Sequence, residues 1–481
     1  MKHDLASAEA FSGGAVPASP GKTRPSREAE ASVRFDRLGR SFGTKVFAAF
    51  CVCGAALVFL SLLARRAQWA DDFNLFVSAA YAQGLVYAFG AFLLLRIEKL
   101  DFDRRVLVAT IVAAAVILRL VALATPPNFL STDVYRYIWD GRVQGAGINP
   151  YLHVPADPAL ISLRDTAVYP HINRLDRAPT IYAPFAQLVF FVITRFADNV
   201  TAMRLGMLGF EAAAVVALAA LVKRCGLPVE RIGLYLLHPL PVWEIACGAH
   251  VDALMMAASV AALLAATAGR RGLAGALLGA ATLTKFLPLV LAPVLYRRWD
   301  WRMPTAFLAT LLALYGAYSL WGGAGWRVLG FLPGYVSEEG LARATGIFIA
   351  ALLRQLGVAP LAAELGFAAI AVGVLGTLTV KSLFRGRDLR ATMILAASLA
   401  VATIVLISPH YPWYFCWIVA FIPFLPRLSL IYLTVSVFYI YVTEDPASVW
   451  TGLVIYGPFL ALLAFEQRRR LWPRLQAGAI P

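Results

Sequence analysis

Long apolar runs separated by short polar segments dominate the chain from residue 45 onward. The runs near 45–64, 74–95 and 106–124 each have about 20 residues, the length that an α-helix needs to cross a bilayer. Comparable runs follow at 203–222, 230–247, 251–268, 303–321, 361–380, 390–407, 413–425, 430–443 and 449–466. The pattern predicts an all-α integral membrane protein, a bundle of about 12–14 transmembrane helices.

Three further apolar segments are not predicted to cross the membrane as single straight helices. The runs 182–196 and 345–357 are short, and the first begins at Tyr182-Ala183-Pro184. We expect both to be re-entrant or interfacial, which is tolerated where the segment lines a polar cavity. The stretch 272–298 is either one long span or a hairpin that turns near Lys285, and the basic pair at 297–298 favours the hairpin.

Composition and charge agree with a membrane protein and exclude an ordinary soluble domain. Hydrophobic residues make up 60% of the chain, charged residues only 15%, and the mean hydropathy is +0.70. In a soluble protein the net charge of +15 would suggest nucleic-acid binding. Here the basic residues lie in short loops and tails, as is typical of cytoplasmic segments. We therefore expect no nucleic acid, and a multi-pass protein of the inner (plasma) membrane with both termini in the cytoplasm.

The same pattern divides the chain into three parts. Residues 1–44 are polar, with several arginines, and are expected to form a disordered basic cytoplasmic tail without a cleavable signal peptide. Residues 45–466 form the transmembrane domain, and 467–481 form a second cytoplasmic tail. Within the domain, three spans counted from a cytoplasmic N-terminus place the stretch 125–181 outside as a long loop, and its balanced acidic and basic residues support this. The five cysteines show no metal or disulfide spacing and are expected to be small buried hydrophobes.

A polar island at the start of this outer loop, residues 131–142, is the strongest candidate for chemistry. Asp133 and Asp140 are seven residues apart, so on a helix both carboxylates would share one face with Arg136 between them. A carboxylate near an acceptor hydroxyl can act as a general base, and a nearby cation keeps it ionised. The alternative for Asp133 is an ordinary salt-bridged loop residue. The aromatic side chains of Tyr135, Tyr137 and Trp139 either stack on a sugar or anchor the segment at the lipid interface.

Further ionisable residues interrupt apolar runs elsewhere in the chain: Glu244, His250, Asp252, Lys285 and His410. Such groups are costly at membrane depth and usually face the interior of a bundle, although a lysine can also extend to the head groups. The expected topology places them at the same end as the polar island. There, a lysine and histidines could neutralise a phosphate leaving group. Two potential ligands at 250 and 252 are too few for a metal site, and we expect no metal.

Several of these segments together resemble a known family. They are 133–142 (Asp-x-Tyr-Arg-Tyr-x-Trp-Asp-Gly-Arg), 147–151 (Gly-x-Asn-Pro-Tyr), 180–184 (Thr-Ile-Tyr-x-Pro), 248–252 (Gly-x-His-x-Asp), 285–288 (Lys-x-x-Pro) and 408–414 (Ser-Pro-x-x-Pro-Trp-Tyr). In this order they are similar to motifs of the bacterial polyprenyl-phosphate-dependent mannosyltransferases of the GT-C glycosyltransferase superfamily. The resemblance extends over roughly 75–470.

The resemblance implies a membrane glycosyltransferase whose active site opens on the extracytoplasmic face. The donor would be a polyprenyl-phosphate sugar, a hexose and by family mannose, and the acceptor a hydroxyl of a lipid or glycan. Asp133 would be the catalytic base. No cofactor is expected, because the lipid-linked sugar is itself a substrate. The residues expected to bind substrate are Tyr135, Arg136, Asp140, Arg142, Asn149, His171, Tyr182, His250, Asp252, Lys285, His410, Trp413 and Tyr414.

Two other functions stay open at this point. A transporter or flippase for a polar lipid would place its charges near the bilayer midplane, with repeat symmetry, whereas here they gather at one rim. A catalytically inactive protein of the same fold could act as a scaffold. Replacing Asp133 separates the enzyme from the scaffold, and detection of a covalent product separates it from the transporter.

Overall fold

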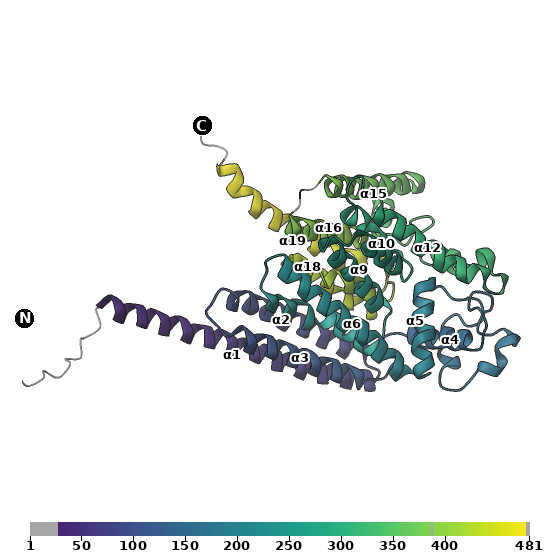
Figure 1. Cartoon of the computed structure of the whole chain (residues 1–481), viewed down its shortest axis with the longest axis horizontal. Coiled ribbons are helices and arrows are strands. Elements are labelled where there is room, and N and C mark those ends of the chain that lie inside the picture. Colours follow the sequence, from purple (N-terminus) through teal and green to yellow (C-terminus); the bar gives the residue numbers. More distant parts are fainter. Residues whose placement is uncertain (1–26, 385, 387, 478–481) are drawn as a thin grey trace, which may run out of the picture.

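The computed structural model describes residues 27–384, 386 and 388–477 (Figure 1). Within these residues the chain forms helices joined by loops and turns, and no β-strand occurs. Many of the helices are long and apolar enough to cross a membrane. The prediction of an all-α membrane protein is therefore confirmed.

By length and composition, eight helical segments in the described part of the chain qualify as membrane spans, or nine if one bent pair is counted. This number is lower than the 12–14 expected. The qualifying segments belong to α1 (Arg27–Trp69), α2 (Phe73–Ile97), α3 (Arg104–Leu123), α6 (Val200–Arg224), α12 (Arg302–Leu320), α15 (Pro360–Leu383), α16 (Leu389–Ile407) and α19 (Val449–Ala477).

Two kinds of segment explain the difference: the expected span 251–268 is a continuous helix of only 16 residues, α9 (Asp252–Thr267), and three others are broken helices. The segment 229–247 consists of η3 (Val229–Ile232), α7 (Gly233–Leu236), α8 (Pro239–Pro241) and the π-helix η4 (Val242–Cys247). The segment 412–441 likewise consists of η8 (Pro412–Phe415), α17 (Cys416–Val419), α18 (Leu428–Ser436) and η9 (Val437–Tyr441). Prolines recur in both segments; one inside a helix removes a backbone donor and clashes with the preceding turn, whereas Pro239 and Pro412 begin new helical elements. An apolar run indicates a segment in the membrane but not that its helix is continuous.

The stretch after residue 270 is a hairpin, as expected. It consists of α10 (Arg271–Thr282), η5 (Leu287–Leu291) and α11 (Ala292–Leu295), with Lys285 in the turn. The guanidinium of Arg271 donates to the carbonyl of Leu295 at 3.3 Å, so the two ends of the stretch lie together. The short helices α5 (Pro184–Phe196) and α14 (Phe348–Gln355) correspond to the two runs that were not expected to cross.

The first helix begins earlier than the sequence pattern suggested. α1 starts at Arg27 and is continuous to Trp69, so it includes residues 27–44 of the expected disordered tail. This part of the sequence contains alanine, arginine and glutamate, which favour helices, and extending an existing helix is far easier than nucleating one. Residues 1–26 and 478–481 lie outside the described residues, as do the side chains of 469–477.

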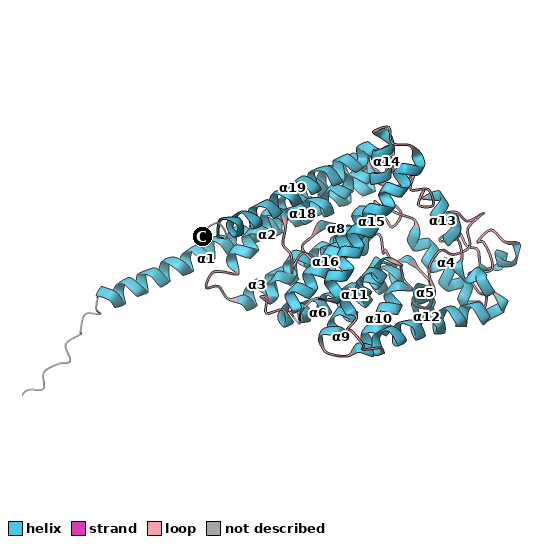
Figure 2. Cartoon of the chain, turned by 90° about the horizontal axis from the view of Figure 1, so that it is seen from above, coloured by secondary structure: helices cyan, strands magenta, loops and turns pink. Residues whose placement is uncertain are grey.

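The two ends of the bundle differ. α4 (Asp133–Gly145), α5 and the second half of α12 lie at one end, opposite the start of α1 and the end of α19 (Figures 1 and 2). We call it the α4 end. A Cβ atom on Gly141 would lie 2.5 Å from the carbonyl oxygen of Phe190, so glycine allows α4 to pack closely on α5. The side-chain amide of Asn149 donates to the carbonyls of Tyr318 and Trp321 at 2.8 Å each, which fixes the outer loop to α12.

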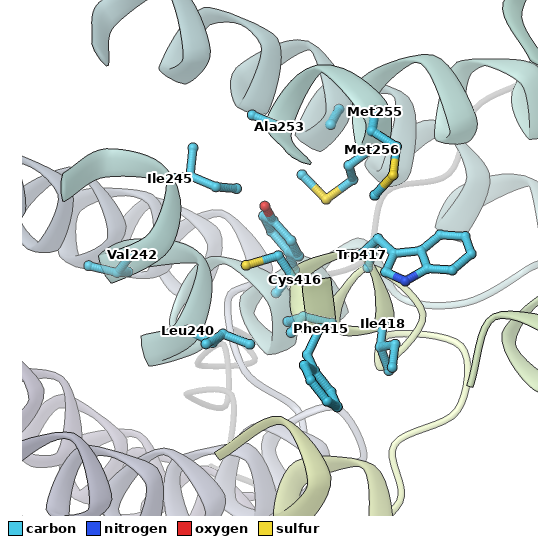
Figure 3. Close-up of a cluster of buried hydrophobic side chains, with 14 of the residues drawn as sticks. Leu240, Val242, Ile245, Ala253, Met255, Met256, Phe415, Cys416, Trp417 and Ile418 are labelled. Atoms are coloured by element: carbon cyan, nitrogen blue, oxygen red, sulfur yellow. The ribbon is translucent and has the colours of Figure 1, made fainter. Parts of the chain in front are cut away.

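Broken segments meet in the core of the bundle. Figure 3 shows side chains of residues 240–256 beside those of residues 415–418. Met256, Cys416 and Trp417 are all almost completely buried. Irregular backbone at membrane depth is stable where protein, rather than lipid, surrounds it. The helix breaks in these two segments are therefore stable because the surrounding protein shields them from lipid.

Candidate active site

A cavity of about 680 Å³ lies at the α4 end. Its wall comes from the loop before α4, residues 173–183, the turn at 284–287, α13 (Leu332–Glu338), the loop at 407–414 and residues 440–446. Among the residues predicted to act on substrate, those that line this cavity are Asp133, Arg136, Tyr182, Lys285, His410, Trp413 and Tyr414. Segments far apart in sequence thus meet around one space.

Asp133 is the first residue of α4, where the partial positive charge of the helix N-terminus favours a carboxylate. The side-chain amide of Asn173 donates to its Oδ1 at 2.9 Å. Burial raises the pKa of Asp133 above its usual range, while the charge of Lys285 and the hydrogen bonds of Asn173 and Tyr182 oppose this rise. The result is a carboxyl group suited to accept a proton at the cavity wall.

Lys285 lies in the turn of the α10 hairpin. Its Nζ is 2.6 Å from Oδ2 of Asp252 and 3.9 Å from the centre of the Tyr414 ring. The Tyr414 hydroxyl is in turn 2.8 Å from the hydroxyl of Tyr335 on α13. The carboxylate and the ring fix the ammonium group, which therefore faces the cavity as a preorganised positive charge.

His250 and Asp252 lie directly behind the cavity wall, at a sharp break in the bundle. The segment 239–247 and α9 (Asp252–Thr267) meet there at an angle of 119°. A Cβ atom on Gly248 would lie 2.8 Å from the His250 ring, so glycine is required for the imidazole to occupy this place. The imidazole stacks on Trp413, with ring centres 3.9 Å apart. His250 and Asp252 are fully buried, and Trp413, on which His250 stacks, lines the cavity.

His410 connects two loops of the α4 end. Its Nδ1 is 3.0 Å from Glu339 Oε2, and its Nε2 is 2.9 Å from the carbonyl oxygen of Gly346. Burial alone would lower the pKa of His410, but the hydrogen bond and the charge of Glu339 outweigh it, so the pKa is raised. Both ring nitrogens face acceptors, which favours the doubly protonated, positive imidazolium.

α13 covers one side of the cavity and is held by contacts at both of its ends. The backbone N–H of Phe331 donates to the carbonyl of Thr180 at 2.9 Å. At the other end, Arg174 donates to Glu338 at 2.7 Å, and the Tyr411 hydroxyl donates to Glu339 at 2.9 Å. The sequence patterns did not single out the residues that line the cavity or hold α13 in place: Asn173, Arg174, Tyr335, Glu339 and Tyr411. Polar residues are common in outer loops, so no local pattern distinguished these five from solvated surface.

Two of the predicted binding residues on α4 lie away from the cavity. The carboxylate of Asp140 is buried and accepts from Arg136 Nε at 2.9 Å and from Gln187 Nε2 at 2.8 Å. Arg142 pairs with Asp165 and Asp198, each at 2.8 Å. These contacts hold α4 against α5 and the outer loop. Asp133 and Asp140 therefore lie in different environments although both belong to α4: Asp133 lines the cavity, and Asp140 is buried between α4 and α5.

Three more predicted binding residues have structural contacts outside the cavity. Asn149 fixes the outer loop to α12, as described above. The rings of Tyr135 and His171 contact each other with centres 4.7 Å apart, and His171 is exposed to solvent. None of the three lines the cavity.

Within the described ranges, no group of three or more His, Cys, Asp or Glu side chains is placed to hold a metal ion. All five cysteines are free thiols; Cys51 is partly exposed and the others are buried. The cavity wall combines the carboxyl group of Asp133, the ammonium group of Lys285 and several aromatic side chains.

Comparison with known proteins identifies the family. The family model described as the N-terminal domain of alpha-(1->6)-mannopyranosyltransferases, MptA_B family, matches residues 37–300. This match covers more than half of the chain and includes Asp133, His250, Asp252 and Lys285. No curated protein and no solved structure matches the chain. The chain belongs to the MptA_B family of alpha-(1->6)-mannopyranosyltransferases and is a multi-pass membrane mannosyltransferase.

Proposed function

We propose that this mannosyltransferase is of the GT-C type and takes its sugar from a polyprenyl-phosphate donor. The acceptor is a hydroxyl of a lipid or glycan on the extracytoplasmic face of the inner membrane. The description of the family supports an α-1,6 linkage in the product. The observation that carries the proposal is the presence of Asp133 and Lys285 in the wall of one cavity at one end of the bundle.

The two side chains divide the reaction between them. Asp133 removes the proton from the acceptor hydroxyl as its oxygen forms a bond to the anomeric carbon of mannose. The bond between that carbon and the phosphate oxygen breaks, and its electron pair leaves with the polyprenyl phosphate. Lys285 stabilises the negative charge that develops on the departing phosphate. Arg136 and the protonated His410 add positive charge to the same wall.

The lining of the cavity supports a lipid-linked donor. Beside the charged groups, apolar side chains form much of the wall, among them Phe73, Leu130, Leu287, Phe331, Ile407 and Ile440. Polar recognition groups next to apolar surface suit a substrate that carries both a phosphosugar and a hydrocarbon chain. The aromatic residues Tyr182, Trp413 and Tyr414 provide surfaces on which a sugar ring can stack.

The distribution of charged residues supports the proposed orientation of the protein in the membrane. Basic loops gather at the end opposite α4, where Arg231 pairs with Glu98 at 2.8 Å and Arg104 with Glu230 at 3.5 Å. Arg390 at the start of α16 reaches the carbonyl of Cys225 at this same end. Excess arginine and lysine is typical of the cytoplasmic side. We assign both termini to the cytoplasm and the cavity to the outer face, with no nucleic-acid partner and no cofactor.

The Asp133→Asn variant tests the proposal in purified protein with a polyprenyl-phosphate mannose donor. The amide keeps the size of the side chain but cannot accept the proton, so turnover should fall at least about 100-fold while the protein still folds. Asp176→Asn is the matched control, because Asp176 is an exposed carboxylate of the same outer loop. Full activity of Asp133→Asn would refute the base assignment. Movement of the donor across vesicles without a mannosylated product would indicate a transporter instead.

A further inference from the structure

A buried pair of side chains lies behind the proposed base. Nδ1 of His250 is 4.0 Å from Oδ2 of Asp133, and Nε2 of the same ring is 3.4 Å from Oε2 of Glu244. The hydroxyl of Tyr441 reaches both oxygens of Glu244, at 2.9 and 3.0 Å. His250 and Glu244 are fully buried, so the imidazole is enclosed between two carboxyl groups.

The ring nitrogens of His250 lack ordinary partners. Among the residues that the structure describes, neither nitrogen makes a hydrogen bond of normal geometry. Buried polar atoms without partners are costly, and they are retained where function needs them. Catalytic hydrogen bonds are often long in the absence of substrate and shorten in the reacting complex. The orientation of the ring, fixed by stacking on Trp413, directs Nδ1 toward Asp133.

Two arrangements of protons fit this geometry with Nδ1 as a donor. In each, Tyr441 donates to Glu244, and one further proton lies between Glu244 and Nε2, on either atom. In both arrangements Nδ1 carries a hydrogen that faces Asp133, whether the pair is neutral or consists of two opposite charges. Glu244, on the side of the ring remote from the cavity, thus determines which nitrogens of His250 are protonated.

We propose that His250 and Glu244 are positioning residues for Asp133: Nδ1–H of His250 orients the Asp133 carboxylate toward the acceptor, and Glu244 keeps that hydrogen in place. This inference rests on the proposed function, in which Asp133 is the base. It also changes the expected role of His250, because a ring enclosed by two carboxyl groups does not serve to bind the departing phosphate.

Two substitutions of His250 test the geometry. The amide nitrogen of asparagine can replace Nδ1 and face Asp133, whereas that of glutamine replaces Nε2 and faces Glu244. His250→Gln should lower kcat at least about tenfold, as loss of a supporting contact typically does, with little change in KM for the donor. His250→Asn should keep most of the activity. Equal losses in both variants, or no loss in either, would overturn the proposal.

The dependence of kcat on pH gives a second measurement, which would not change if His250 served only to fill space in the core. A hydrogen bond to the ionised carboxylate lowers its pKa, so loss of the donor in His250→Gln should move the acidic limb of kcat to higher pH. Asparagine should leave this limb in place. The other charged and titratable groups around Asp133 stay the same in both variants: Lys285, Asp252, Arg174, Tyr182 and Tyr137.

Glu244 offers an independent test. In Glu244→Gln the amide donates to Nε2 and preserves the hydrogen on Nδ1, so transfer activity should be kept. In Glu244→Leu no donor to Nε2 remains, and transfer activity should fall as in His250→Gln.

The control is His153→Gln, since His153 pairs with Asp157 at 2.7 Å outside the cavity. Asp133→Asn is assayed in parallel. If it abolishes transfer while His250→Gln and Glu244→Leu are fully active, only the positioning role fails. If Asp133→Asn is active, the base assignment itself fails.

Discussion

Lys285 and Asp252 form a 2.6 Å ion pair in which the carboxylate is completely buried. Within the described part of the chain, the second oxygen of Asp252 has no hydrogen-bond partner. The pair therefore depends on the ammonium group to offset the cost of burying a carboxylate. The same ammonium group faces the cavity, so one lysine links the stability of the bundle to the chemistry of the site.

Replacing Lys285 should separate these two contributions. Lys285→Met leaves Asp252 without its partner and should lower the free energy of unfolding by about 3 kcal/mol. It also removes the charge opposite the leaving phosphate, so turnover should fall about 100-fold or more. Thermal unfolding and initial rates measure the two effects. The double variant Lys285→Met/Asp252→Leu should regain stability but not activity. Recovery of both would show that Lys285 has only a structural role.

Asn173 should control the pH at which the base becomes active. Its hydrogen bond stabilises the ionised form of Asp133 and so lowers the pKa of that carboxyl group. Asn173→Ala removes the bond, the pKa rises further, and transfer should require a higher pH. The acidic limb of the kcat profile is expected to move upward while the alkaline limb stays in place. Asn128→Ala, an exposed asparagine of the same loop, is the control. An unchanged acidic limb in Asn173→Ala would contradict the proposed base.

His410 should make the stability of the protein depend on pH. Its pKa in the folded protein is raised above the value in the unfolded chain, about 6.5. The stabilisation is therefore fully present below pH about 6.5 and is lost as the pH rises through the folded pKa. In His410→Gln this loss should be absent, because glutamine does not titrate. Melting temperatures across this range, compared with those of His153→Gln, test the expectation, and equal slopes in both variants would refute it.

Transfer should not require a metal ion. In the proposed reaction Lys285, Arg136 and His410 provide the positive charge for the leaving phosphate, so no divalent cation is needed. Dialysis against EDTA followed by assay in chelator-treated buffer should leave turnover unchanged, and added Mg²⁺ or Mn²⁺ should not raise it. A loss on chelation that is restored by one of these cations would overturn the expectation.

The sequence predicted the membrane class and the position of the cavity because both depend on local patterns. Apolar runs of spanning length indicate membrane helices, and ionisable residues inside them usually face protein. Lys285 and His410 were singled out in this way and Asp133 by its place in the polar island, and all three line the cavity. The hairpin around Lys285 also followed from the basic residues after it.

What the sequence could not predict depends on contacts between distant segments. Asp140 and Asp133 look equivalent in the motif, yet Gln187 of α5 binds Asp140 and removes it from the cavity. Asn173 and Glu339 have no local signature, since only the folded chain brings them to Asp133 and His410. The number of complete spans was overestimated because hydropathy does not report where prolines interrupt a helix.

The helix break at residues 248–251 has a consequence for which substitutions can be selected during evolution. Ala249 adopts a left-handed backbone conformation there (φ 55°), which is unfavourable for a residue other than glycine. A sequence that closed the break into one continuous helix would relieve this strain, but it would also change the backbone that places His250 4.0 Å from Asp133. If His250 positions Asp133 as proposed, selection for a more stable bundle and selection for transfer act in opposite directions at this short segment.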